Sequence, residues 1–374
     1  MTHLPGQRIR ELLKKELRQM LRDPRMRVVI FVAPVIQLIA FGYAVNTDIK
    51  NTATYVVDLD RSYASRELVQ AFASTGYFRI TGTSDRSSDI ASVLDRGKAI
   101  VGIEIPTDFS RELAQGRASV QVIVDGTNSN TGVVAQGYAG QIVSRYALRH
   151  AATMGGLPSG GAELRTRAWY NPQLESRVYN VPAVVGALVM LMCLLLTSLA
   201  VVREREMGTL DQLMVSPLRP QELILGKTVP VMLVGLIQIT LISSVAILWF
   251  GIPMRGTIFA LSLAGLAYIL AGLSFGLIIS TISKTQQEAF MSMFLLFMPL
   301  VILSGFFFPV SSMPRVFQWL TILNPMRHFI EIVRAVFLKG EGVVGLWPQY
   351  LALATIAAVA LTLAIRRFMK TSVA

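Results

Sequence analysis

The chain has 374 residues, of which 53% are hydrophobic and only 16% are charged, and its mean hydropathy is +0.53. Soluble domains carry about 25% charged residues, so this composition and several long apolar runs place the chain among integral membrane proteins. The net charge of +12 does not indicate nucleic-acid binding, because eight Lys and Arg gather in residues 1–27 while the polar segment 46–178 is nearly balanced. Cys193 is the only cysteine, so no intrachain disulfide can form, and we expect it to pack against helices or lipid.

Residues 1–27 predict a cytoplasmic arm that contains an amphipathic helix on the inner leaflet. In RIRELLKKELRQMLRDP, apolar residues recur at helical spacing on one face and basic residues crowd around the rest. A plain positive flank of the first span is the alternative. The apolar positions are Ile9, Leu12, Leu13, Leu17, Met20 and Leu21.

Six apolar segments have close to the ~20 residues that a bilayer requires. Six spans put both termini on one side, and the basic ends of the chain indicate that this side is the cytoplasm. Four basic residues in the outer loop 306–343 conflict with that orientation. The first segment has the basic flank of a signal peptide, but its length favours a retained span. The predicted spans are 28–45, 181–202, 226–250, 257–281, 289–309 and 344–365.

The polar segment 46–178 predicts a small α/β domain on the outer side, between the first two spans. Short runs with β-strand character alternate with runs of helical periodicity. The expected strands are 54–60, 99–106 and 118–126, and the expected helices are 65–75, 87–97, 107–116 and 132–151, the third of these capped by Thr107. Residues 154–161 have the composition of a flexible linker.

The segment 203–222 begins REREMGTLDQLMVSPLRP and joins the second and third spans. Gly208 suits a helix C-terminus, because glycine reaches the left-handed conformation without steric cost. Thr209 then begins a short helix with the spacing of a capping box. The two basic and two acidic residues at 203–206 cancel in charge. The segment therefore suits docking to a protein better than binding to anionic lipid. A solvated turn is the alternative.

The string EREMGTLDQLMVSPLRPQELILGK resembles the signature of ABC-2 type transporter permeases, especially bacterial export permeases with a large periplasmic domain after the first span. FGYAVNTD, DGTNSNT, LSGFFFPVSSMP and NPMRHFIEIVRAVFL extend the resemblance over most of the chain. It implies a half-transporter that pairs with a second permease and with two cytosolic ABC ATPase subunits. In that family the segment after the second span contacts the ATPase, and the N-terminal helix lies beside it.

The resemblance therefore predicts ATPase-coupling residues at Arg203, Glu204, Arg205, Glu206, Gly208, Thr209 and Leu210. We expect that the chain is not an enzyme and binds no cofactor, and that the partner ATPase uses ATP and Mg. Its own Gly226-Lys227-Thr228 lacks the glycine that a phosphate-binding loop places five positions earlier, where Gln221 stands.

Other motifs do not indicate catalysis or metal binding. The GLSFG run at 272–276 matches a nucleophile elbow, but inside a span Gly272 and Gly276 fit a small-residue packing face better. His3, His150 and His328 show no metal spacing. Asp58 and Asp60 are interpreted as a solvated strand edge.

The centres of the spans lack ionisable residues, which disfavours ion-coupled transport. The polar residues Gln37, Gln238, Thr240, Ser243 and Ser244 are expected to hydrogen-bond between helices. Of these, Gln37, Gln238 and Ser243 are candidates for the transport path.

The outer loop 306–343 predicts short helices that lie on or dip into the outer membrane face, because three prolines divide it. Arg327, Glu331 and Arg334 have the spacing of helix-face ion pairs. Trp347 and Tyr350 fit an aromatic belt at the start of the last span.

The sequence thus predicts an α-helical membrane protein with six transmembrane helices (residues 28–45, then five in 179–374), an N-terminal amphipathic helix and an extracytoplasmic α/β domain. We interpret it as the permease of an ATP-driven exporter in the bacterial inner membrane, with both termini cytoplasmic and an amphipathic or drug-like cargo. A receptor with a periplasmic sensing domain and an ion-coupled secondary transporter are the alternatives. The sequence does not identify the cargo, and it does not show whether the second permease is an identical copy or a paralogue. It also leaves open whether a periplasmic adaptor binds. No nucleic-acid partner is expected.

Overall fold

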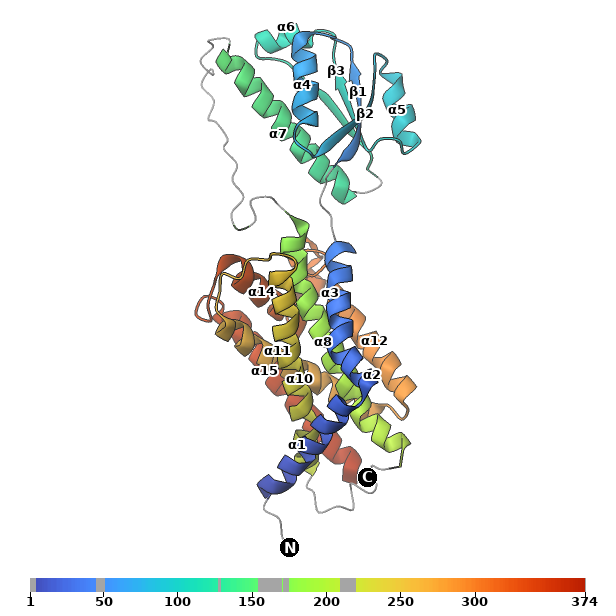
Figure 1. The fold of residues 1–374 in the computed structure, drawn as a ribbon, viewed down its shortest axis with the longest axis vertical. Coiled ribbons are helices and arrows are strands. Elements are labelled where there is room, and N and C mark those ends of the chain that lie inside the picture. Colours follow the sequence, from blue (N-terminus) through green and yellow to red (C-terminus); the bar gives the residue numbers. More distant parts are fainter. Residues whose placement is uncertain are drawn as a thin grey trace. The chain divides into compact units, whose positions relative to one another are not determined.

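The computed structural model describes residues 5–44, 51–126, 129–153, 170, 175–208 and 220–373. The chain forms two compact units, one made of Met1–Asn46 with Ala168–Ala374 and the other of Thr47–Arg167 (Figure 1). The second unit therefore ends before residue 178, the bound expected from the sequence. The expected linker 154–161 lies outside the described residues.

The unit Thr47–Arg167 is an α/β domain built on a four-stranded sheet of order β2-β1-β3-β4. Strands β1, β2 and β3 run parallel, and β4 runs antiparallel to β3. Its elements are β1 (Thr52–Asp58), α4 (Tyr63–Ala73), β2 (Phe78–Ser84), α5 (Ser88–Asp95), β3 (Val101–Ile105), α6 (Phe109–Ala114), β4 (Gln121–Val124) and α7 (Ser129–Thr153). The alternation of strands and helices read from the sequence is present.

Two details of this unit differ from the sequence-based prediction. Strand β2 was not expected, because its FRITGTS sequence carries a glycine and three hydroxyl residues and has little apolar character. Helix α6 has Asp108 rather than Thr107 at its N-cap position. The core of the unit lies where α4, α6 and α7 pack with the sheet, and it contains Val56, Phe72 and Ile103.

The other unit is a bundle of apolar helices. Its elements are α1 (Pro5–Arg22), α2 (Pro24–Arg27), the π-helix η1 (Val28–Val32), α3 (Ala33–Ala44), α8 (Ser176–Glu206), α10 (Pro220–Leu248), α11 (Ile258–Ile282), α12 (Gln286–Ile302), the 3-10 helix η2 (Val310–Ser312), α13 (Arg315–Thr321), α14 (Pro325–Arg334), the π-helix η3 (Ala335–Lys339) and α15 (Trp347–Val373). Within the described residues, α8, α10, α11 and α15 have the length and composition to cross a membrane.

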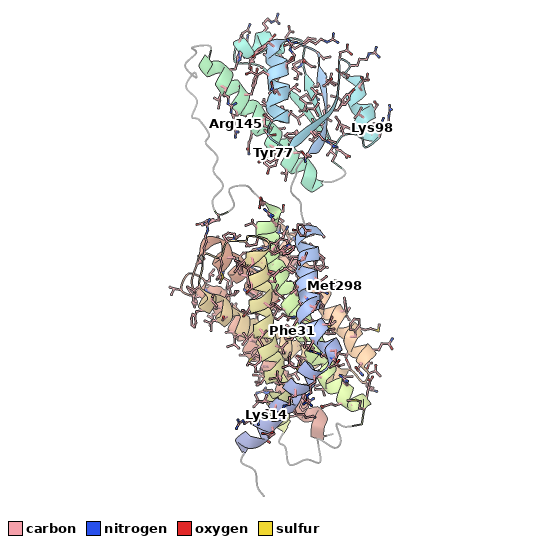
Figure 2. The ribbon with its side chains drawn as sticks, in the orientation of Figure 1. Lys14, Phe31, Tyr77, Lys98, Arg145 and Met298 are labelled. Atoms are coloured by element: carbon pink, nitrogen blue, oxygen red, sulfur yellow. The ribbon has the colours of Figure 1, made fainter. Side chains whose placement is uncertain are left out.

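The first and fifth predicted spans correspond to shorter apolar helices, Val28–Ala44 and Gln286–Ile302. The fifth span was predicted to reach residue 309, but its helix ends at Ile302 and the chain turns at Gly305, whose φ is +81°. Exposed apolar side chains, such as Met298 on α12 (Figure 2), cover the outside of the bundle, as expected for surfaces that face lipid.

Helix α8 is at the centre of the bundle, where it packs against α3, α10, α11, α12 and α14. The closest approach is to α11, where a Cβ placed on Gly276 would lie 2.7 Å from Thr197 Cβ and 3.2 Å from the Ser198 amide nitrogen. Gly272 approaches Cys193 in the same way. The small-residue face and the helix-packed cysteine predicted from the sequence are therefore confirmed.

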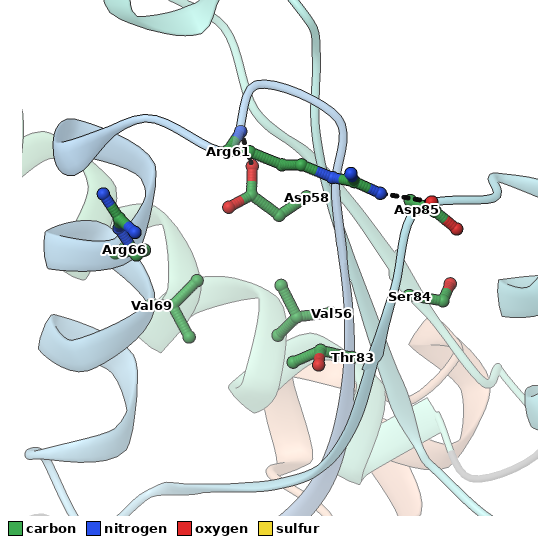
Figure 3. Close-up of a pocket in the computed structure, with 8 residues that line it drawn as sticks. All are labelled: Val56, Asp58, Arg61, Arg66, Val69, Thr83, Ser84 and Asp85. Atoms are coloured by element: carbon green, nitrogen blue, oxygen red, sulfur yellow. Dashed lines mark hydrogen bonds and ion pairs between the residues drawn. The ribbon is translucent and has the colours of Figure 1, made fainter.

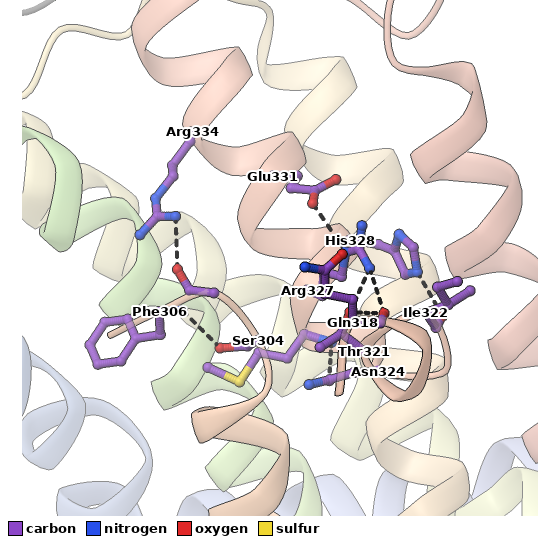
Figure 4. Close-up of polar contacts among 12 residues, drawn as sticks. Ser304, Phe306, Gln318, Thr321, Ile322, Asn324, Arg327, His328, Glu331 and Arg334 are labelled. Carbon is purple, nitrogen blue, oxygen red and sulfur yellow. Dashed lines mark hydrogen bonds and ion pairs between the residues drawn. The ribbon is translucent and has the colours of Figure 1, made fainter. Parts of the chain in front are cut away.

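The segment 306–343 folds into short helices, as predicted, and polar contacts connect them (Figure 4). Asn324 caps α14 by accepting the Met326 N–H at 2.9 Å and donates to the Leu300 carbonyl of α12 at 2.7 Å. Arg327 pairs with Glu331 at 3.2 Å. Arg334 instead donates to the Gly305 carbonyl at 3.1 Å and stacks on the Tyr179 ring of α8.

The residues at the start of α15 differ from the predicted aromatic belt. Trp347 is exposed, as a belt residue should be. Tyr350 is buried and its hydroxyl donates to the Ala260 carbonyl at 2.9 Å, so it joins α15 to α11 instead.

We predict that Gly276→Val destabilises the bundle, because the added methyl groups would meet the backbone of α8. Overpacking of this kind costs about 1–3 kcal/mol, so the midpoint of thermal unfolding in detergent should fall clearly. Ser262→Val is the matched control, since Ser262 is exposed on the same helix. Equal midpoints for the two variants would contradict the close approach of α11 and α8.

Candidate coupling site at the end of helix α8

Helix α8 ends inside the charged segment that the sequence singled out. Glu206 is its last residue, and Gly208 follows with a φ of +67°, the left-handed conformation expected for it. The Met207 N–H donates to the Arg203 carbonyl, and the Gly208 N–H donates to the Arg205 carbonyl, both at 3.1 Å. The helix therefore stops at the residue that the sequence indicated.

A buried lysine at the start of α10 gathers two carboxylates from two other helices. Lys227 Nζ lies 2.7 Å from Glu204 Oε1 on α8 and 3.8 Å from Glu16 Oε1 on α1. It also donates to the Ala200 carbonyl of α8 at 3.4 Å. Because the lysine and both carboxylates are largely shielded from solvent, water screens these attractions weakly.

The next two residues of α8 contact the turn between α11 and α12. The Arg205 guanidinium donates to the Ser283 carbonyl at 2.9 Å. The Glu206 carboxylate accepts the Gln286 backbone N–H at 2.7 Å and also the Gln286 side-chain amide. Consecutive charges thus attach the end of α8 to different neighbours.

Arg203, Glu206 and Met207 form the outward part of this joint, because all three are exposed. Thr209 and Leu210, where the short helix was predicted to begin, lie outside the described residues. Of the four charges of 203–206, Glu204 and Arg205 are half-buried against partners within the chain. Arg203 and Glu206 are exposed, although Glu206 also bonds to Gln286.

Helix α1 packs against α10 rather than standing apart from the bundle. Leu13, Leu17 and Met20 are half-buried on one face with Glu16, while Lys14 on the opposite side is exposed (Figure 2). The amphipathic helix is therefore present, and part of its apolar face contacts protein. The side chains of Ile9 and Leu12 lie outside the description.

The candidate path residues lie on two helices, α3 and α10. Gln238 is buried on α10 and donates to the Ile30 carbonyl of the π-helix at 3.3 Å, so it bonds between helices as predicted. Ser243 is buried on the same helix, and Gln37 is half-buried on α3. In the part of the chain that the structure describes, no hydrogen bond joins Gln37 to either of them.

Two further polar residues of α10 were predicted wrongly. Thr240 donates to the Leu236 carbonyl and Ser244 donates to the Thr240 carbonyl, so both bond within their own helix and not between helices. Threonine and serine commonly satisfy their hydroxyls in this way inside a helix.

Comparison with known proteins identifies the family. The model of the ABC-2 family transporter proteins matches residues 24–366. The chain belongs to the ABC-2 family of transporter proteins. It is 35% identical over 368 residues to the probable multidrug ABC transporter permease YbhR of Escherichia coli, covering 97% of this chain and 99% of that protein.

Two other permeases of Escherichia coli are also similar to this ABC-2 chain. The probable multidrug ABC transporter permease YbhS is 31% identical over 341 residues, or 90% of each chain. The inner membrane transport permease YhhJ is 28% identical over 364 residues, or 96% of each chain. These relatives and the apolar helices show that the chain is the membrane permease subunit of an ABC exporter.

Sequence reasoning missed Lys227 and Glu16 as members of this site. Lys227 was considered only as part of an incomplete phosphate-binding loop. A lysine followed by an apolar run is itself a signal, because a charge at the edge of a membrane span requires a partner. Among the residues that the structure describes, no cluster of His, Cys, Asp or Glu could hold a metal ion.

We predict that Lys227→Met destabilises the permease strongly, because Glu204 and Glu16 would stay buried without their cation. Breaking a buried pair from one side costs about 3–5 kcal/mol. The midpoint of thermal unfolding in detergent should fall, and trypsin should cleave α1 faster. Lys14→Met is the control, since the exposed Lys14–Glu11 pair is worth at most about 1 kcal/mol. Similar shifts in both variants would contradict the buried cluster.

Proposed function

We propose that this permease exports amphipathic, drug-like compounds across the bacterial inner membrane and is driven by ATP hydrolysis in a separate cytosolic ABC ATPase. The arrangement at the end of α8 carries the proposal, because charged residues there join α8 to α1, α10 and the turn before α12. The names of the multidrug permeases YbhR and YbhS support the cargo class.

In this proposal the segment 203–222 transmits the movement of the ATPase. Because Lys227 and Glu204 hold α8 and α10 together, a push on the segment between these helices would move both as one body. Glu16 would bring α1 along. The contact of Glu206 with Gln286 would pass the displacement to α12.

The docking surface would carry one charge of each sign. Glu204 is turned inward to Lys227, whereas Arg203 and Glu206 are both exposed, although Glu206 also bonds to Gln286. We therefore propose that the ATPase presents an acidic group to Arg203 and an apolar contact to Met207. Complementary charge of this kind fixes the register of an interface.

The remaining architecture follows from the same proposal. The two shorter apolar helices would complete six spans, with both termini in the cytoplasm and the α/β unit in the periplasm. A second permease, identical or paralogous, would form the other half of the path. The chain itself would bind no ATP or Mg.

We expect Arg203→Glu with Met207→Asp to weaken copurification with the cognate ATPase at least tenfold, about 1.4 kcal/mol, because the charge at position 203 is reversed and the apolar contact at 207 is lost. The readout is the ratio of ATPase to permease after purification in mild detergent. Arg111→Glu, an exposed charge reversal in the α/β unit, is the control. Normal association of the double variant at normal folding would place the docking surface elsewhere.

Glu204→Gln separates coupling from docking, because its side chain faces Lys227 and not the outward surface. We expect this variant to retain the ATPase but to lose most cargo-stimulated, vanadate-sensitive ATP hydrolysis. Full stimulation by cargo in the variant would contradict the transmission role of the buried pair.

Gln238 is proposed to contact cargo, because its Oε1 is buried without a hydrogen-bond partner among the described residues. We predict that Gln238→Met changes the relative efflux rates of several cationic dyes, since a polar contact matters to some cargoes more than others. Thr240→Val, at an exposed position two residues along α10, is the control. A uniform fall for all dyes together with a lower unfolding midpoint would indicate a packing role only.

A further inference from the structure

A cavity of about 420 Å³, open to solvent, lies at the surface of the α/β unit, beside the carboxyl ends of the parallel strands β1 and β2 and against helix α4 (Figure 3). Its volume is within the range of small-molecule sites, and ligands of open α/β sheets bind at the carboxyl ends of the strands. The lining residues combine charged, hydroxyl and apolar groups: Val56, Asp58, Arg61, Arg66, Val69, Thr83, Ser84 and Asp85.

Asp58 lies at one end of this cavity, and both of its carboxylate oxygens already accept hydrogen bonds from the protein. Its Oδ1 accepts the backbone N–H groups of Asp60 at 3.1 Å and Arg61 at 2.9 Å, while its Oδ2 accepts the Ser65 hydroxyl at 2.7 Å. A carboxylate with three such donors is committed to holding the turn between β1 and α4. Asp58 therefore contributes structure to the site.

Arg61 is held in a costly backbone conformation at the edge of the cavity. Its φ is +51°, a left-handed value that non-glycine residues rarely adopt. From this position its side chain crosses to Asp85, just after β2, and pairs with that carboxylate (Figure 3). Both side chains are more than half exposed, so the pair is weak and a ligand can replace either partner.

Arg66 supplies a second cation, from the first turns of α4 on the other side of the cavity (Figure 3). No carboxylate pairs with its guanidinium in the described part of the chain. Val69, half-buried on α4, provides apolar surface beside it, and the fully buried Val56 lies behind this lining. The four charged groups sum to zero, so the cavity does not favour a polyanion or a polycation.

We propose that this cavity binds a small zwitterion, a molecule that carries an ammonium and a carboxylate or similar anionic group on a short apolar stem. The anion would pair with Arg66, whose planar guanidinium binds carboxylates through two parallel hydrogen bonds. The ammonium would pair with Asp85 in exchange for Arg61, and the stem would lie on Val69. The site is contained in the α/β unit, so binding can be tested without transport.

The test is calorimetric titration of the full-length permease in detergent with ω-amino acids from 3-aminopropionate to 6-aminohexanoate. Butyrate and butylamine, which carry one charge each, are compared with 4-aminobutyrate. We expect at least one ω-amino acid to bind at least tenfold tighter than either single-charge compound. Arg66→Gln and Asp85→Asn should each weaken that binding at least tenfold.

Arg79→Gln and Asp95→Asn are the matched controls, because both residues are exposed in the same unit and neither lines the cavity. Both should bind as the unchanged protein does. The proposal is overturned if no ω-amino acid binds at about 10 mM, far above any useful affinity. It is also overturned if butyrate binds as tightly as 4-aminobutyrate, or if the cavity variants and the control variants behave alike.

Discussion

The arrangement of the helical unit depends on the requirement that a buried ammonium group has an anionic partner. Lys227 stands where the charged segment gives way to an apolar helix, and it is shielded from solvent. The free-energy cost of burying its charge is offset only if carboxylates approach it closely. Glu204 and Glu16 meet this requirement from α8 and α1, so one electrostatic constraint fixes three helices at the same place.

The same constraint decides which charged side chains of residues 203–206 are buried against the bundle and which face solvent. On a helix, consecutive side chains point about 100° apart, so the four charges of REREM cannot share one face. Glu204 therefore turns to Lys227 while Arg205 and Glu206 reach the turn before α12. Arg203 and Glu206 stay exposed, so the exposed part of the segment keeps one charge of each sign.

The features predicted well from the sequence are those set by local chemistry. The end of α8 at Gly208, the amphipathic helix α1 and the helix pair joined at Gly276 follow from backbone freedom, periodicity and side-chain size. The features that were missed depend on distant partners. Strand β2 is specified by pairing with β1 more than by its own composition, and the role of Lys227 appears only when α1 and α8 are brought beside it.

The two units use charge in opposite ways. In the helical unit the lysine and its carboxylates are shielded, so water screens their attraction weakly. In the α/β unit the Arg61–Asp85 pair is exposed and Arg66 lacks a carboxylate partner among the described residues, so the charges are weakly held and available. Burial thus distinguishes the two sites. The buried joint would transmit movement without opening, whereas the charged groups of the exposed cavity can exchange partners with a ligand.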